Sequence, residues 1–134
     1  MRMEKTTHIR PRVDRRSLSV NPSITDRFGR TFNYLRLAVN EYCNLRCIYC
    51  MPEEGVPFKV KEKLLTTKEI FKLIRIMTDM GVSKIRFTGG EPLLRKDIPD
   101  LIHYASEIST VDSVHLTTNG LLLPGYLEGL EQAG

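Results

Sequence analysis

The sequence has no apolar run long enough to cross a bilayer, and its first residues lack the apolar core of a secretory signal peptide. It has only 3 cysteines, all between positions 43 and 50. An odd cysteine count without a secretion signal argues against a disulfide framework. We therefore expect reduced cysteines, a cytoplasmic location and no membrane partner.

The composition is that of an ordinary globular domain, with 41% hydrophobic and 27% charged residues in a chain of 134. The net charge is +4, and much of the excess lies in residues 1–25, which have little hydrophobic periodicity. This segment is expected to be a basic mobile arm. No aromatic residues interleave its arginines, which favours a solvated tail over a nucleic-acid-binding segment.

Strand and helix signals alternate after the arm. The expected strands are residues 34–40, 84–88 and 113–118. A capping box from Thr66 to Glu69 begins one helix, and Gly81 ends it. Asp97 is a plausible N-cap of the next helix, and a short helix follows Pro124. This order predicts an α/β fold, with a parallel sheet and crossover helices.

The three expected strands have one apolar face and one polar face, because successive side chains of a strand point to opposite sides. The apolar parity holds Leu35, Leu37, Val39, Ile85, Phe87, Val114 and Leu116. The polar parity holds Arg36, Ala38, Lys84, Arg86, Thr88, His115 and Thr117. The apolar face should meet the helices, and the polar one suggests a lumen for a polar ligand, with an exposed sheet face as the alternative. Three strands would leave an open face, so we expect the N-terminal part of a longer protein.

The cysteines Cys43, Cys47 and Cys50 have the spacing Cys-x3-Cys-x2-Cys. Three thiolates on one short loop suggest a 4Fe–4S cluster with one iron open to an outside ligand, as in a catalytic rather than a closed structural site. A zinc site would need a fourth ligand, and the 3 histidines are not at knuckle spacing. A zinc site and three apolar cysteines without metal remain the alternatives.

The cysteine loop, with Tyr49 before its last cysteine, resembles that of the radical S-adenosylmethionine (SAM) enzymes. In that family the open iron binds SAM, and an electron from the cluster releases a 5′-deoxyadenosyl radical. The resemblance implies a 4Fe–4S cluster and SAM as cofactors, and an electron donor that the sequence does not identify. It also implies a partial (βα)6 barrel, of which residues 26–134 would be the N-terminal portion.

Within that superfamily, residues 27–134 are most similar to the GTP 3′,8-cyclases that begin molybdenum-cofactor biosynthesis. The similarity is carried by residues 32–37, 50–55, 85–92 and 117–120. It implies a lyase with GTP as substrate, and a homodimer is compatible with the full-length enzyme. A peptide-modifying radical SAM enzyme and a non-catalytic zinc module are the alternatives.

The resemblance assigns roles by position and gives no side chain a catalytic role. The implied metal ligands are Cys43, Cys47 and Cys50. The implied SAM contacts are Tyr49, Gly89, Gly90 and Glu91. The implied GTP contacts are Arg36, Arg86 and Thr117, which the strand parity already places on one face. The second three-cysteine cluster of the cyclases is missing, so these 134 residues are not expected to complete the reaction.

Overall fold

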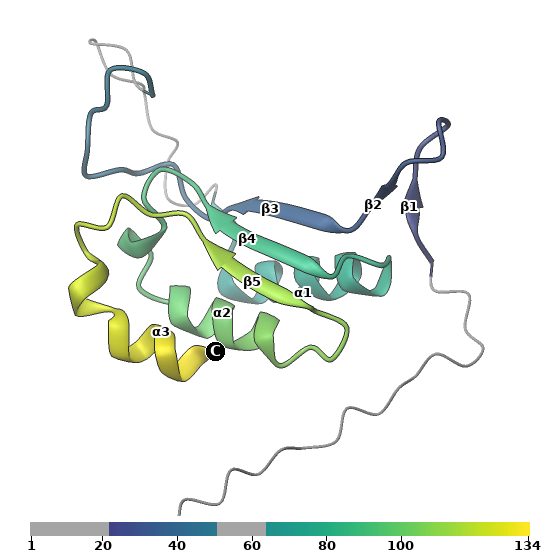
Figure 1. The fold of residues 1–134 in the computed structure, drawn as a ribbon. Helices are drawn as coiled ribbons and strands as arrows, with labels where there is room; N and C mark the ends of the chain where they lie inside the picture. Colours follow the sequence, from purple (N-terminus) through teal and green to yellow (C-terminus); the bar gives the residue numbers. More distant parts are fainter. Residues whose placement is uncertain (1–21, 51–63) are drawn as a thin grey trace, which may run out of the picture.

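The computed structural model describes residues 22–50 and 64–134. Its main sheet is parallel, with strand order β3-β4-β5. The strands are β3 (Tyr34–Ala38), β4 (Lys84–Thr88) and β5 (Ser113–Leu116). The helices are α1 (Thr67–Asp79), α2 (Ile98–Ser106) and α3 (Leu127–Ala133), and all lie on one side of the sheet (Figure 1). The predicted α/β order with a parallel sheet is confirmed.

Two sequence-based expectations fall outside the described residues. They are the basic arm over residues 1–21 and the segment 51–63, which includes most of one stretch similar to the cyclases. Within the described ranges, no helix has the length and apolar character that a bilayer crossing requires.

The predicted capping box starts α1. The Thr66 hydroxyl accepts a hydrogen bond from the backbone N–H of Glu69 at 3.3 Å, and the Glu69 carboxylate accepts one from the backbone N–H of Thr66 at 2.7 Å. The Thr66 hydroxyl also donates to the Glu69 carboxylate at 2.8 Å, and the bonds that this carboxylate accepts from the backbone N–H and the hydroxyl of Thr66 hold the pKa of Glu69 below its ordinary value. After the helix, Gly81 takes φ +96°, and a Cβ there would lie 2.6 Å from the carbonyl oxygen of Pro22. Glycine therefore ends α1 as predicted.

Asp97 is the N-cap of α2, as expected, but its side chain makes no capping hydrogen bond. Its carboxylate instead accepts bonds from Arg95 at 2.9 and 3.1 Å and from the Thr67 hydroxyl. Burial raises the pKa of Asp97, and the bonds from Arg95 and Thr67 outweigh it, so the net pKa is lowered. Arg95 also donates to the carbonyls of Val39 and Leu65 at 3.0 and 2.9 Å. The end of β3 and the starts of α1 and α2 are thus joined.

The core lies between the sheet and the helices. The buried side chains of β3 and β4 are Leu37, Ile85 and Phe87, and those of α1 and α2 include Ile70, Ile74, Ile98 and Leu101. The apolar strand parity therefore meets the helices, as predicted. The opposite face is covered by none of the described helices (Figure 1).

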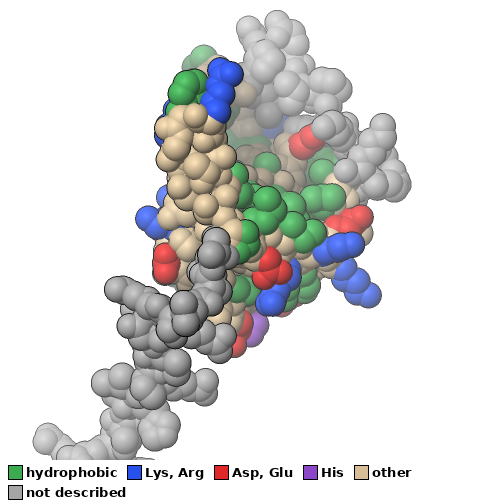
Figure 2. All heavy atoms as spheres, turned by 90° about the vertical axis from the view of Figure 1, so that its right-hand side faces the viewer, with side chains coloured by type: hydrophobic (Ala, Val, Ile, Leu, Met, Phe, Trp, Pro, Cys, Tyr) green, Lys and Arg blue, Asp and Glu red, His purple; other side chains and the backbone are tan. Residues whose placement is uncertain are grey.

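A short hairpin precedes the sheet and was not predicted. Its antiparallel strands are β1 (Ile24–Thr25) and β2 (Thr31–Phe32). The Asp26 carboxylate accepts from the backbone N–H of Arg30 at 3.0 Å and from its Nε at 2.7 Å, and Gly29 takes φ +79° in the turn. Figure 2 views the molecule from this end, with arginine side chains, in blue, at the hairpin tip. The expected boundary after residue 25 therefore falls inside the hairpin. Strands of two residues are too short to produce a periodic signal.

Two strands end earlier than expected. β3 ends at Ala38 and β5 at Leu116, although the backbone N–H groups of Val39 and Thr117 still donate to Thr88 and Phe87 at 2.9 and 3.0 Å. Beyond these bonds the chain turns away to form the loops that carry the candidate site.

Candidate cofactor and substrate site

The carboxyl ends of the parallel strands lie at one edge of the sheet. The loop of residues 41–50, which carries the cysteines, follows β3 and projects from this edge, at the end opposite the β1–β2 hairpin (Figure 1). In closed α/β barrels the corresponding edge carries the active site.

Two glycines follow β4 and allow two backbone segments to touch. Gly89 takes φ +146°, and a Cβ there would lie 2.5 Å from the carbonyl oxygen of Asn40. A Cβ on Gly90 would collide with the carbonyl of Tyr42. The N–H of Gly90 donates to Asn40 at 3.0 Å, and that of Glu91 donates to Tyr42 at 2.6 Å. In the described residues, the absence of a Cβ at these glycines therefore allows the backbone after β4 to approach the backbone of residues 40–42. Their contact with SAM stays a prediction.

Glu91 is fully buried, and its carboxylate is surrounded by donors of the protein. One oxygen accepts from the backbone N–H of Leu93 at 2.9 Å and from the Thr118 hydroxyl at 2.7 Å. The other accepts from the backbone N–H of Asn119 at 2.8 Å, and the Glu91 carbonyl accepts from the Asn40 amide at 3.0 Å. Glu91 thus joins the ends of all strands of the main sheet, a role that the sequence pattern did not indicate. Its SAM contact stays a prediction.

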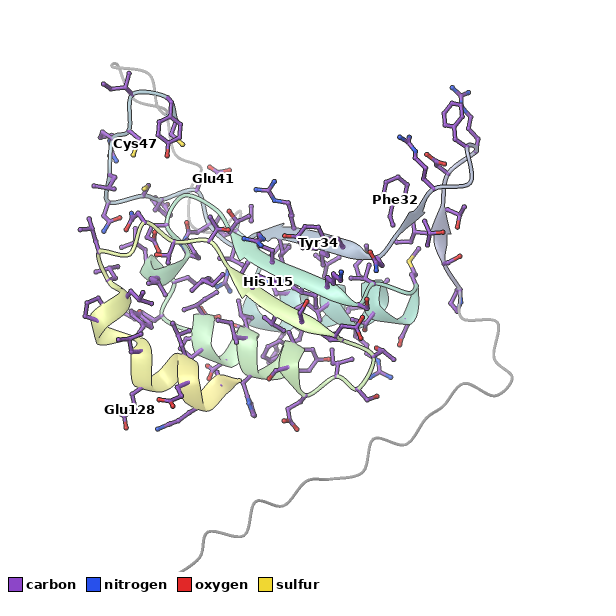
Figure 3. The ribbon with its side chains drawn as sticks, in the orientation of Figure 1. Phe32, Tyr34, Glu41, Cys47, His115 and Glu128 are labelled. Atoms are coloured by element: carbon purple, nitrogen blue, oxygen red, sulfur yellow. The ribbon has the colours of Figure 1, made fainter. Side chains whose placement is uncertain are left out.

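The cysteines are unpaired, with Cys43 and Cys47 half-buried and Cys50 exposed. The Cys43 sulfur accepts hydrogen bonds from the backbone N–H of Leu45 at 3.4 Å and from the Asn119 amide at 3.9 Å. The N–H of Cys50 donates to the carbonyl of Cys47 at 2.9 Å, which closes a turn. Figure 3 shows Cys47 on the projecting part of the loop.

The pKa of the Tyr49 phenol depends on the charges near it, because negative charge opposes the ionisation of a phenol. The charge of Cys50 raises the pKa of Tyr49 most, followed by that of Cys47, and Cys43 contributes as well. Tyr49 itself is 90% exposed. The cysteines are therefore near enough to Tyr49 for their charge to act on its phenol.

The donor set fits an iron–sulfur cluster better than a closed zinc site. Positions 43–50 offer thiols and neither carboxylates nor imidazoles. Across residues 22–50 and 64–134, no group of three or more His, Cys, Asp or Glu side chains is arranged around one metal position. A tetrahedral zinc site would need a fourth such ligand. Cluster ligands on one loop can converge when the metal binds, since metal binding is coupled to local folding.

The residues expected to contact GTP lie on the uncovered face of the sheet. Arg36 of β3 and Arg86 of β4 are paired in register, and Arg36 is exposed. Nη1 of Arg86 donates to the Thr117 hydroxyl at 3.1 Å. The structure therefore brings the two arginines and the threonine together on one polar surface. Their contact with GTP stays a prediction.

Tyr34 and His115 share this surface and were not among the predicted site residues (Figure 3). The Tyr34 hydroxyl accepts a hydrogen bond from Nε of Arg86, and the guanidinium carbon lies 5.9 Å from the centre of the Tyr34 ring. The rings of Tyr34 and His115 are 6.5 Å apart, edge to face. Strand parity already placed His115 on this face, where it lies beside Arg86 in register. The same parity could have found Tyr34, which lies two residues before Arg36 on β3.

The fold and the site define an α/β protein with a thiol-rich candidate iron–sulfur loop at the carboxyl edge of its parallel strands. The profile of the radical SAM superfamily matches residues 37–134, which is well over half of the chain. The chain belongs to the radical SAM superfamily.

Several curated proteins are similar to most of the chain. The "Molybdenum cofactor biosynthesis protein 1" of Drosophila melanogaster is 48% identical over 90% of the chain, and that of Bos taurus is 44% identical over 98%. The "GTP 3′,8-cyclase" of Petrotoga mobilis is 45% identical over 81% of it. The chain spans 21% of each animal protein and 34% of the bacterial one.

Proposed function

We propose that this chain is part of a radical SAM enzyme that cyclises GTP in the first step of molybdenum-cofactor biosynthesis. One observation carries the proposal: the three-cysteine loop follows the carboxyl end of β3, one of the strands whose uncovered face holds Arg36, Arg86 and Thr117. The names of the similar proteins support both the pathway and the substrate. A partial (βα)6 barrel, completed by residues outside this chain, is part of the proposal.

The proposed cofactors are a 4Fe–4S cluster held by Cys43, Cys47 and Cys50, and SAM. When bound, they supply a 5′-deoxyadenosyl radical that abstracts a hydrogen atom from the substrate. The proposed SAM contacts are Tyr49, Gly89, Gly90 and Glu91. The unpaired cysteines support a reducing, cytoplasmic compartment.

Arg86 is the proposed substrate ligand with the best-defined position. Its guanidinium is held from two sides, by the Tyr34 hydroxyl and by the Thr117 hydroxyl. A planar guanidinium fixed in this way can direct its remaining N–H groups at phosphate or purine oxygens with little further loss of entropy. The neighbouring Arg36 adds positive charge on the same surface.

Replacing Arg86 with alanine is expected to weaken GTP binding by about 1.5–3 kcal/mol, the range for a hydrogen bond to a charged group. Calorimetry on the anaerobically reconstituted chain measures the affinity, and iron content should stay at the wild-type level. Arg75→Ala is the matched control, because Arg75 is an exposed arginine of α1 paired with Asp79 at 3.3 Å. Equal GTP affinity for the two variants would remove Arg86 from the site.

The reconstituted chain is expected to cleave SAM slowly and to form no cyclised nucleotide. The cysteine loop and the Gly89–Gly90 turn are present, but the chain spans only 34% of the Petrotoga cyclase, and none of the described helices covers its polar surface. The experiment supplies SAM, GTP and a chemical reductant without oxygen, and measures 5′-deoxyadenosine and nucleotide products. Absence of 5′-deoxyadenosine from cluster-loaded chain would count against SAM as the cofactor of these residues. Formation of cyclised GTP by this chain alone would show that these 134 residues already contain a complete active site, contrary to the proposal.

A further inference from the structure

Asn119, the residue two positions after Thr117, uses its side chain to connect β5 with the cysteine loop. Its amide nitrogen donates to the Asn44 side-chain oxygen at 2.7 Å and to the Cys43 sulfur at 3.9 Å. Its amide oxygen accepts from the backbone N–H of Leu121 at 3.0 Å. Because that oxygen faces a donor, the nitrogen is the atom directed at the loop.

The backbone of Asn119 is fixed as firmly as its side chain. Its N–H donates to the fully buried Glu91 carboxylate at 2.8 Å, and the preceding Thr118 donates to the other oxygen of that carboxylate. The amide is thus held on a support that includes the end of β4. In contrast, Cys47 lies on the projecting part of the loop (Figure 3). Cys43 is therefore the thiol whose position the body of the fold determines.

The Asn119 amide is also an electrostatic partner of the Cys43 sulfur, alongside the backbone N–H of Leu45. N–H donors to the sulfurs of an iron–sulfur cluster stabilise its negative charge, and so they raise its reduction potential. A donor supplied from the end of β5 can act on the cluster without contacting iron.

We propose that Asn119 is a positioning residue for the proposed cluster: it fixes Cys43 and donates an N–H to its thiolate. The proposal rests on the proposed function, because it requires a cluster on Cys43, Cys47 and Cys50. Loss of the donor should favour the oxidised cluster, and a negative charge in its place should favour it further.

The test compares Asn119→Asp and Asn119→Ala with Asn33→Asp. Asn33 is an exposed asparagine before β3, at the opposite end of the strands, and its Asp variant makes the same chemical change. Each chain is reconstituted without oxygen, its iron and sulfide are measured, and the cluster is titrated electrochemically with its electron paramagnetic resonance signal recorded. Amide hydrogen exchange over residues 41–50 is measured on the metal-free chains.

We expect Asn119→Ala to lower the potential, with Asn119→Asp shifting the oxidised-to-reduced ratio at least tenfold, which is about 59 mV for one electron. Exchange over residues 43–46 should become several-fold faster in both variants, and Asn33→Asp should match the wild type. Wild-type potential and exchange in both Asn119 variants would overturn the proposal while leaving the cluster in place. Faster exchange at an unchanged potential would overturn the N–H contribution. A wild-type chain that takes up no iron and sulfide would contradict the proposed function itself.

Discussion

Replacing Cys47 with alanine is expected to abolish the iron–sulfur cluster completely. The loop supplies only three thiols, and a 4Fe–4S cluster that keeps one iron open for SAM needs all of them. Anaerobically reconstituted wild-type chain should hold about four iron and four sulfide per chain. The variant should hold neither, and it should lose the absorption of the cluster.

The matched control is Ile48→Ala, in the same loop. Ile48 is 99% exposed, so its loss should change neither the fold nor the metal content. Iron at the wild-type level in Cys47→Ala would refute the assignment of the thiols. Zinc without sulfide in the wild-type chain would indicate instead the non-catalytic zinc module considered from the sequence.

The sequence predicted the local structure best where short-range chemistry decides it. The capping box at Thr66 and the stop at Gly81 were found because their partners lie within a few residues. The faces of the strands were found because the apolar parity is continuous in all three. The β1–β2 hairpin was missed, since it depends on the contacts of one aspartate in its turn rather than on a hydrophobic pattern.

The site was predicted less completely, because its remaining contacts join distant positions. Asn119 and Cys43 are 76 residues apart in the sequence, and Arg86 and Tyr34 are 52 apart. Whether such side chains meet depends on strand register and on the path of loops, and neither is encoded in local periodicity. The motif positions identified the loop and the turn, but not the hydrogen bonds that hold them.

Glu91 shows this difference most clearly. Its motif position suggested a contact with SAM, whereas the structure places its carboxylate among donors from the ends of β4 and β5. Both roles predict that a Glu91 variant loses activity, so activity alone does not separate them. The stability of the chain without iron and SAM does separate the two roles. Without the cofactor, only the hydrogen bonds of Glu91 within the protein can contribute to the free energy of unfolding.

Glu91→Ala is therefore expected to destabilise the metal-free chain by about 3–5 kcal/mol, because each of the three donors left without its acceptor costs about 1–3 kcal/mol. The donors of Leu93, Thr118 and Asn119 would lose their acceptor inside the protein, where water does not replace it. That loss is a large share of a typical unfolding free energy of about 5–15 kcal/mol. Urea unfolding followed by circular dichroism measures it.

Glu131→Ala is the control, because Glu131 is an exposed glutamate of α3, and its loss should change the unfolding free energy by less than about 0.5 kcal/mol. Glu91→Gln should fall between the two, since its amide keeps one acceptor oxygen but turns a donor toward the N–H of Asn119. If Glu91→Ala unfolded at the same urea concentration as Glu131→Ala, the carboxylate would not hold the strand ends together. Its importance would then have to arise at the cofactor. If Glu91→Ala destabilises the chain as expected, the backbone of Asn119 also loses its hydrogen bond to the Glu91 carboxylate. Iron uptake would then be weakened as well, although Glu91 itself binds no iron.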